Sequence, residues 1–125
     1  MTTLPTTKAL GDAAEARALD HLSAAGLVLV RRNYRVARGP GSRGGEVDLV
    51  MRDPDGTIVF VEVRARRDSR FGGAAASIGA AKRRRLIFAA SHYLRGLAAP
   101  PACRFDVVAV DGERIEWLRA AFDAG

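Results

Sequence analysis

Two short apolar segments joined by a strong turn signal constrain the fold of this chain more than any other feature. The first, Glu46–Arg52, alternates acidic and apolar residues, and the second, Thr57–Arg66, carries Ile, Val and Phe along most of its length. Asp53-Pro54-Asp55-Gly56 lies between them and combines the residue types that favour a tight turn. The pattern therefore predicts a hairpin of two antiparallel strands.

The predicted hairpin places two acidic residues, Asp48 and Glu62, on neighbouring strands. We predict the register in which Val50 lies opposite Phe60, because it also puts Asp48 directly opposite Glu62. A shift by one residue would send the two acids to opposite faces, since side chains alternate along a strand with a period of two. Like charges opposite each other destabilise a sheet, so this pair requires compensation by basic side chains or by a cation.

A pair of carboxylates suits a hard divalent cation such as Mg²⁺ or Mn²⁺, which prefers oxygen ligands and keeps several waters. Such an ion can polarise a phosphodiester and lower the pKa of a bound water. Glu46 precedes Asp48 on the same face and either extends the acidic row or is a solvated strand end. Glu15 lies at the edge of an apolar helical stripe and either reaches the same site or pairs with Arg17 or Arg119.

The segments on either side of the hairpin predict two helices and three further strands. Thr6 or Thr7 is expected to cap a first helix that runs to about Ala25, and Ser77 is expected to cap a second that runs to about Leu97. The predicted strands are 27–36, 104–110 and 114–118, the last followed by a short helical end. The order is therefore helix-strand-strand-strand-helix-strand-strand, an α/β class with a central mixed β-sheet flanked by helices. We expect one domain over residues 1–125, with residues 1–6 as a flexible tail.

The chain is strongly basic, with 20 Lys and Arg against 14 Asp and Glu and a formal net charge of +6. This excess favours a polyanionic partner such as nucleic acid or an anionic membrane surface, and we expect nucleic acid rather than a surface that is basic only for solubility. The residues predicted to contact phosphates are Arg66, Arg67, Arg70, Lys82, Arg83 and Arg84. We expect the Lys82 amine to point outward, with its stem across apolar surface. No apolar run is long enough to cross a bilayer, and a cytoplasmic location is expected.

Five motifs carry a resemblance to a known family: Gly11-x-x-x-Glu15, Arg32-Asn33-Tyr34-Arg35, Gly45-Glu46-Val47-Asp48-Leu49-Val50, Val59-Phe60-Val61-Glu62-Val63-Arg64 and Arg104-Phe105-Asp106-Val107-Val108. They resemble the YraN-type family of small, uncharacterised bacterial proteins. The resemblance implies a restriction-endonuclease-like, Holliday-junction-resolvase-like fold and an endonuclease-like activity on DNA, including branched or repair intermediates. It further implies that Asp48 and Glu62 hold the metal, with the Val63 carbonyl as a third ligand and Glu15 as the acid from the first helix. A homodimer is expected by the same analogy.

The resemblance departs from the nuclease pattern at one position. The nuclease motif ends in Glu-x-Lys, whereas this chain has Glu62-Val63-Arg64. Arginine stays charged and is a poor general base, although it can hold a phosphate and stabilise a transition state. Three functions therefore stay open: a metal-dependent endonuclease, a catalytically inactive nucleic-acid-binding protein of the same fold, and a protein-interaction module.

Overall fold

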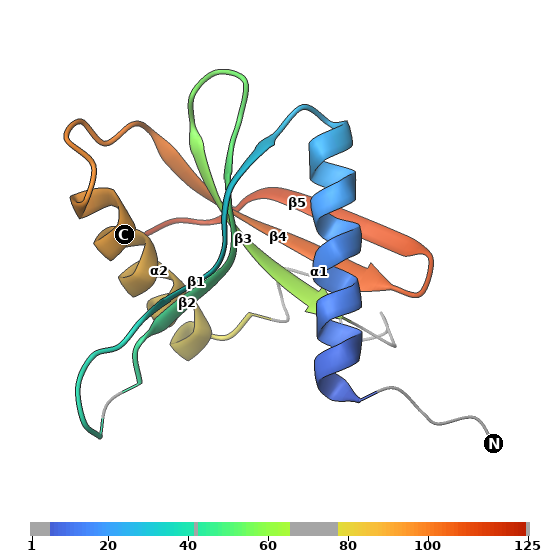
Figure 1. Cartoon of the computed structure of the whole chain (residues 1–125), viewed down its shortest axis with the longest axis horizontal. Helices are drawn as coiled ribbons and strands as arrows, with labels where there is room; N and C mark the ends of the chain where they lie inside the picture. The colour runs from blue at the N-terminus through green and yellow to red at the C-terminus, as the bar shows by residue number, and fades with distance from the viewer. Residues whose placement is uncertain (1–5, 42, 66–77, 125) are drawn as a thin grey trace.

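A five-stranded mixed sheet with one helix on each face makes up the computed structural model, which describes residues 6–41, 43–65 and 78–124 (Figure 1). The elements are α1 (Thr7–Ala24), β1 (Val28–Val36), β2 (Gly45–Arg52), β3 (Ile58–Ala65), α2 (Ala80–Arg95), β4 (Cys103–Asp111) and β5 (Arg114–Phe122). The α/β class and the predicted order of elements are confirmed. The architecture is compatible with a restriction-endonuclease-like fold.

The strands lie in the sheet in the same order as in the sequence, from β1 to β5. Neighbours pair antiparallel except β3 and β4, which are parallel and have α2 between them in the chain. The predicted hairpin register is confirmed from Arg52–Ile58 to Leu49–Val61, with Val50 opposite Phe60, but strand pairing ends before the predicted Asp48–Glu62 pair. Neither helix in the described ranges has the length and apolar character that a bilayer crossing requires.

The core has two halves, one on each face of the sheet. Val50 and Phe60 pack on the α2 side with Leu86, and Leu49 and Val61 pack on the α1 side. The central strands are therefore covered on both faces, as their continuous apolar runs require. The predicted apolar stripe of α1 is confirmed, and its buried members are Ala14, Ala18 and Leu22.

Helix α1 has a capping residue at its N-terminus and a glycine just after its C-terminus. The Thr6 side chain accepts a hydrogen bond from the Ala9 amide at 3.0 Å, which confirms Thr6 as the N-cap. At the other end Gly26 adopts a positive φ of 100°, and the Leu27 amide donates back to the Leu22 carbonyl at 3.1 Å. This arrangement satisfies carbonyl groups that the helix end would otherwise leave unpaired.

Two boundaries differ from the sequence-based expectation. Helix α2 begins at Ala80 with Gly79 as its N-cap, and Ser77 lies outside the described residues. The short helical end predicted after Leu118 is wrong, because β5 continues to Phe122 through a register irregularity opposite β4. Ala120 has a positive φ of 49° in this stretch.

A buried carboxylate holds the irregular end of β5 in place. Asp106 is fully buried and accepts hydrogen bonds from the Trp117 indole and the Ala120 amide, both at 2.9 Å. It also accepts from the Arg104 Nε at 3.1 Å, and Arg104 donates in turn to Asp53 at 2.6 Å. Asp106 therefore ties β4, β5 and the turn after β2 into one network.

The start of β2 lies against α2 so closely that only glycine fits at position 45. A Cβ atom there would lie 2.4 Å from the Arg85 carbonyl oxygen and 2.8 Å from the Ala89 amide nitrogen. We expect Gly45→Ala to lower the free energy of unfolding by about 2 kcal/mol, because backbone has to move to admit the methyl group. Urea denaturation measures the change.

The matched control for that substitution is Gly11→Ala on α1, where a Cβ would meet no heavy atom within 4 Å. It is expected to raise the free energy of unfolding by roughly 0.5–1 kcal/mol, because alanine has the higher helix propensity. A Gly45→Ala protein as stable as the parent would contradict the tight contact between β2 and α2.

Candidate functional site

Asp48 and Glu62 lie where the hydrogen-bonded pairing of β2 and β3 ends. The last recorded pair is Leu49 with Val61, and the two acids follow directly on the two strands. Beyond this point β2 and β3 part, as Figure 1 shows. The Val63 amide donates to Asp48 Oδ2 at 2.8 Å, so a side-chain carboxylate takes the place of a strand partner.

Both acids are buried, which is rare for carboxylates without a partner. Asp48 is 8% exposed and Glu62 is 3% exposed. Glu62 Oε1 lies 3.3 Å from Lys82 Nζ and 3.9 Å from Arg64 Nη1. Glu62 Oε2 is buried and has no hydrogen-bond partner among the described residues. A buried carboxylate oxygen without a donor is costly, and a hydrogen bond between Glu62 and Asp48 relieves this only while one of the two carboxyl groups is protonated. When both are charged, a cation could occupy the position.

Burial and proximity shift the protonation of this pair. Burial, followed by the charge of Asp48, raises the pKa of Glu62 to about 8, while Lys82 acts in the opposite direction. Burial also raises the pKa of Asp48, against the effect of the Val63 amide. The two carboxyl groups therefore resist carrying two negative charges together in the absence of an added cation.

Lys82 lies at the site itself, which the sequence reasoning missed. Its amine was expected to point outward, and that expectation is wrong, because Nζ contacts Glu62 and the side chain is only 27% exposed. Helix α2 brings Lys82 to the pair from one face of the sheet, while Arg64 follows Glu62 on β3. One signal was present in the sequence, since Lys82 and Lys8 are the only lysines in a chain whose other basic residues are arginines.

Glu15 approaches the pair from α1, on the other face of the sheet. Burial, followed by the charge of Asp48, raises the pKa of Glu15, which places the two acids within electrostatic reach of each other. The alternative partners do not engage it. Arg17 donates to the Glu113 carbonyl at 3.0 Å, and the Arg119 guanidinium lies 4.1 Å from the centre of the Trp117 ring.

Glu46 pairs with Arg35 of β1, while its charge contributes to raising the pKa of Asp48. Its carboxylate lies 3.4 Å from Arg35 Nε, and the two residues are directly opposite in the β1–β2 register. The Glu46 side chain is 40% exposed. Glu46 thus forms part of a surface ion pair, and the acidic row predicted along β2 is divided at this residue.

The donor set at the pair has two carboxylates. Across residues 6–41, 43–65 and 78–124, no three side chains of the His, Cys, Asp and Glu types stand close enough to hold a metal together. Asp48 and Glu62 nevertheless fit Mg²⁺ or Mn²⁺, because such ions use one or two carboxylates and keep several waters. The unpartnered Glu62 oxygen is the observation that favours this fit.

The residues predicted to bind nucleic acid lie in different structural environments. Arg66, Arg67 and Arg70 lie outside the described residues. The Arg83 guanidinium lies 5.2 Å from the centre of the Phe122 ring, at the edge of the core. Arg84 is exposed on the outer side of α2. The geometry thus separates Lys82, which contacts Glu62, from the two arginines that follow it.

The raised pKa of Glu62 leads to a testable pH dependence. A carboxyl group with a higher pKa in the folded state stabilises the fold while it is protonated, and this stabilisation is lost as the pH rises. We expect the metal-free protein to lose up to about 1.4 kcal/mol of stability per pH unit between pH 5 and 8 from this residue. Chemical denaturation in EDTA across this range measures the slope.

Glu62→Gln is the control for this pH dependence, because glutamine does not titrate. Its slope is expected to be flatter than that of the parent between pH 5 and 8, with the remaining slope due to Asp48 and Glu15, whose pKa values are also raised. Equal slopes for the two proteins would show that Glu62 titrates in its ordinary range.

Sequence comparison shows which known proteins this chain is similar to. The sequence model of a family described as "Uncharacterised protein family UPF0102" matches residues 14–110. A UPF0102 protein of Methylibium petroleiphilum is 64% identical over 119 residues, which cover 95% of this chain and 98% of that protein. A UPF0102 protein of Paracidovorax citrulli is 63% identical and covers 96% of this chain and 87% of its own length. One of Albidiferax ferrireducens is 59% identical, with 98% and 94% covered.

Proposed function

The chain belongs to the uncharacterised protein family UPF0102, and we propose that it acts as a metal-dependent endonuclease that hydrolyses phosphodiester bonds in DNA. The observation that carries the proposal is the buried Asp48–Glu62 pair with its unpartnered oxygen. Such a pair is unfavourable on its own and becomes favourable with a divalent cation between the strands. The basic character of the chain supports a polyanionic substrate.

Each residue of the site has a role in this proposal. Asp48 and Glu62 would hold Mg²⁺ or Mn²⁺, with the Val63 carbonyl as a further ligand. When bound, the cation would polarise the phosphodiester and lower the pKa of a water. The Val63 amide keeps Asp48 oriented through its 2.8 Å hydrogen bond. Glu15, with its raised pKa, is suited to exchange a proton on the Asp48 side of the site.

Lys82 and Arg64 provide the positive charge that the reacting phosphate requires. Both lie within 4 Å of Glu62 Oε1 and come from different elements, α2 and β3. The motif that contains Glu62 ends in Arg64, where the nuclease motif has a lysine. Lys82 of α2 places an ammonium group beside Glu62 from another element. Two cations directed at one phosphate stabilise the charge that develops in the transition state.

The ion pair between Lys82 and Glu62 also supports a second candidate, a DNA-binding protein without cleavage activity. An ammonium 3.3 Å from Glu62 partly compensates the buried charge without any metal. In that case Asp48 and Glu62 would have a structural role, and the basic surface would bind DNA phosphates without a metal ion. Binding to an acidic protein partner is the remaining alternative.

The deciding experiment is cleavage of duplex, single-stranded and branched DNA with Mg²⁺, with Mn²⁺ and with EDTA. We expect cleavage with either metal, none in EDTA, and faster cleavage of branched substrates. Asp48→Asn is expected to be inactive. DNA binding without cleavage of any substrate would favour the second candidate. A protein that fails to bind DNA even at low salt would favour the protein-partner alternative.

A further inference from the structure

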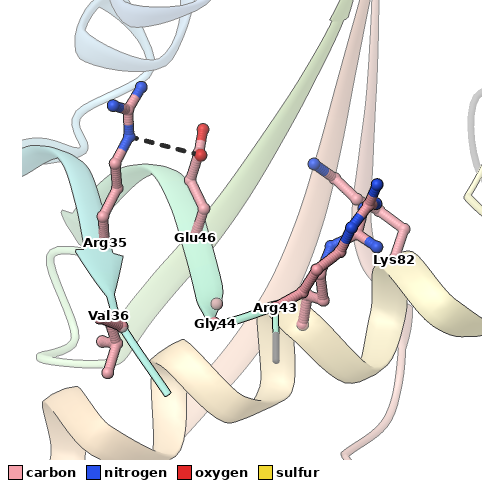
Figure 2. A pocket seen from close by; sticks show the side chains of 9 residues that line it. Arg35, Val36, Arg43, Gly44, Glu46 and Lys82 are labelled. Carbon is pink, nitrogen blue, oxygen red and sulfur yellow. Dashed lines mark ion pairs between the residues drawn. The ribbon is translucent and has the colours of Figure 1, made fainter. Parts of the chain in front are cut away.

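A basic pocket of about 410 Å³ lies beside the carboxylate pair, between the end of β1, the start of β2 and the first turns of α2 (Figure 2). In Figure 2, Arg35 and Glu46 lie on one side of it, joined by their ion pair, and Arg43 and Lys82 lie together on the other. Arg85 of α2 also lines it. The pocket thus shares Glu46 with the start of β2 and Lys82 with the candidate metal site.

The charges around the pocket do not balance. Among the described residues that line it, Glu46 is the single acid and is paired with Arg35, while the Lys82 amine is directed at Glu62. Arg43 and Arg85 make no ion pair with any described residue. Within residues 6–41, 43–65 and 78–124, two guanidinium groups therefore border one hollow without an anion to compensate them.

Two glycines line the hollow where β1, β2 and α2 pack closely. A Cβ at Gly44 would lie 1.7 Å from the Val36 carbonyl oxygen, and one at Gly45 would lie 2.4 Å from that of Arg85. The backbone at the start of β2 therefore packs directly against β1 and α2 at this wall of the hollow. A second hollow of about 210 Å³ shares Arg43 and Arg85 and extends the basic surface along α2 to Arg84.

We propose that Arg43 and Arg85 bind a backbone phosphate of the DNA strand that neighbours the phosphate undergoing hydrolysis. The inference rests on the proposed function, because the pocket adjoins the Asp48–Glu62 pair through Lys82. Guanidinium groups present paired donors that match phosphate oxygens, and they remain charged at any physiological pH. A phosphate held here fixes the position of the strand across the carboxylate pair.

The test is the binding of labelled single-stranded and duplex DNA in EDTA, where no cleavage occurs, over a series of salt concentrations. Arg43→Ala and Arg85→Ala are each expected to weaken binding about tenfold. The slope of log affinity against log salt should fall in magnitude by about 0.7 for single strands and 0.9 for duplex. The matched control is Arg95→Ala at the other end of α2, which removes the same charge and should change both quantities little.

Thermal unfolding of each variant shows whether it has kept its fold. Arg43 is exposed, so its substitution tests the pocket even if Arg85→Ala is unstable. Variants at Arg43 and Arg85 that bind DNA as Arg95→Ala does would overturn the proposal. A glutamate-rich polypeptide that binds the parent protein but not Arg43→Ala, while both proteins bind DNA equally, would also overturn it, in favour of an acidic protein ligand.

Phosphate binding at the pocket and nuclease activity are two proposals that experiment can refute independently. If pocket variants lose DNA affinity while the parent cleaves nothing, the pocket stands and the nuclease proposal fails. If the parent cleaves DNA through Asp48 and pocket variants bind normally, the activity stands and the pocket proposal fails.

Discussion

Glu62→Gln is expected to reduce metal-dependent cleavage of DNA about a thousandfold while the protein remains folded. A bound divalent ion contributes several kcal/mol of transition-state stabilisation, and each 1.4 kcal/mol corresponds to a factor of ten in rate. Glutamine keeps the shape of the side chain, but it removes the charge that would hold the ion. The fold should tolerate the change, because the pKa of about 8 already favours the uncharged form at neutral pH.

Cleavage rates and metal titration by calorimetry measure this prediction together. Glu116→Gln on β5 is the matched control, since it makes the same chemical change at an exposed position. It should leave cleavage and metal binding unaltered. A Glu62→Gln protein that cleaves within a few-fold of the parent would remove Glu62 from the metal site.

Asp106→Ala is expected to lower the free energy of unfolding by roughly 3–5 kcal/mol. The substitution leaves the Trp117 indole, the Ala120 amide and the Arg104 Nε without their common acceptor. Each buried donor left without an acceptor costs about 1–3 kcal/mol, and three donors lose theirs here, although Arg104 keeps its ion pair with Asp53. A domain of this size has a total stability of about 5–15 kcal/mol, so the loss is a large share of it.

Urea denaturation of Asp106→Ala measures the loss, with Asp123→Ala as control. Asp123 is an exposed acid just after β5, and its removal should change stability by less than about 0.5 kcal/mol. A change below 1 kcal/mol in Asp106→Ala would show that the network around β5 is dispensable.

The hairpin and its register were accessible from sequence because local signals set both. The turn Asp53–Gly56 limits the connection to a short loop, and the alternation of side chains then leaves a single register that buries Val50 with Phe60. The juxtaposition of Asp48 and Glu62 follows from that register. The resemblance to the YraN-type family pointed to the same two acids, and membership of the UPF0102 family agrees with it.

The contacts from outside the hairpin were not accessible from sequence. Lys82 is 20 residues beyond Glu62, and only the packing of α2 on the sheet brings its amine to the acid. The pairing of Arg35 with Glu46 depends on the β1–β2 register, which shifts at an irregularity between Leu29 and Arg31. A one-residue slip of this kind has no clear sequence signature.

The end of β5 escaped prediction for a different reason. The strand is irregular near Ala120, whose positive φ is unusual for alanine, whereas the sequence predicted a short helical end there. The conformation is held by the hydrogen bond from the Ala120 amide to Asp106, a residue of the preceding strand. Long-range side-chain acceptors of this kind lie beyond any local pattern.

The hydrogen bond between the Val63 amide and Asp48 gives the site a spectroscopic reporter. Most amides in a sheet exchange with solvent at rates set by the opening of strands, but the acceptor of this one is a carboxylate. Its chemical shift and exchange rate consequently follow the state of that carboxylate. A single backbone resonance can thus register what occupies the gap between β2 and β3, in the intact protein and without any substitution.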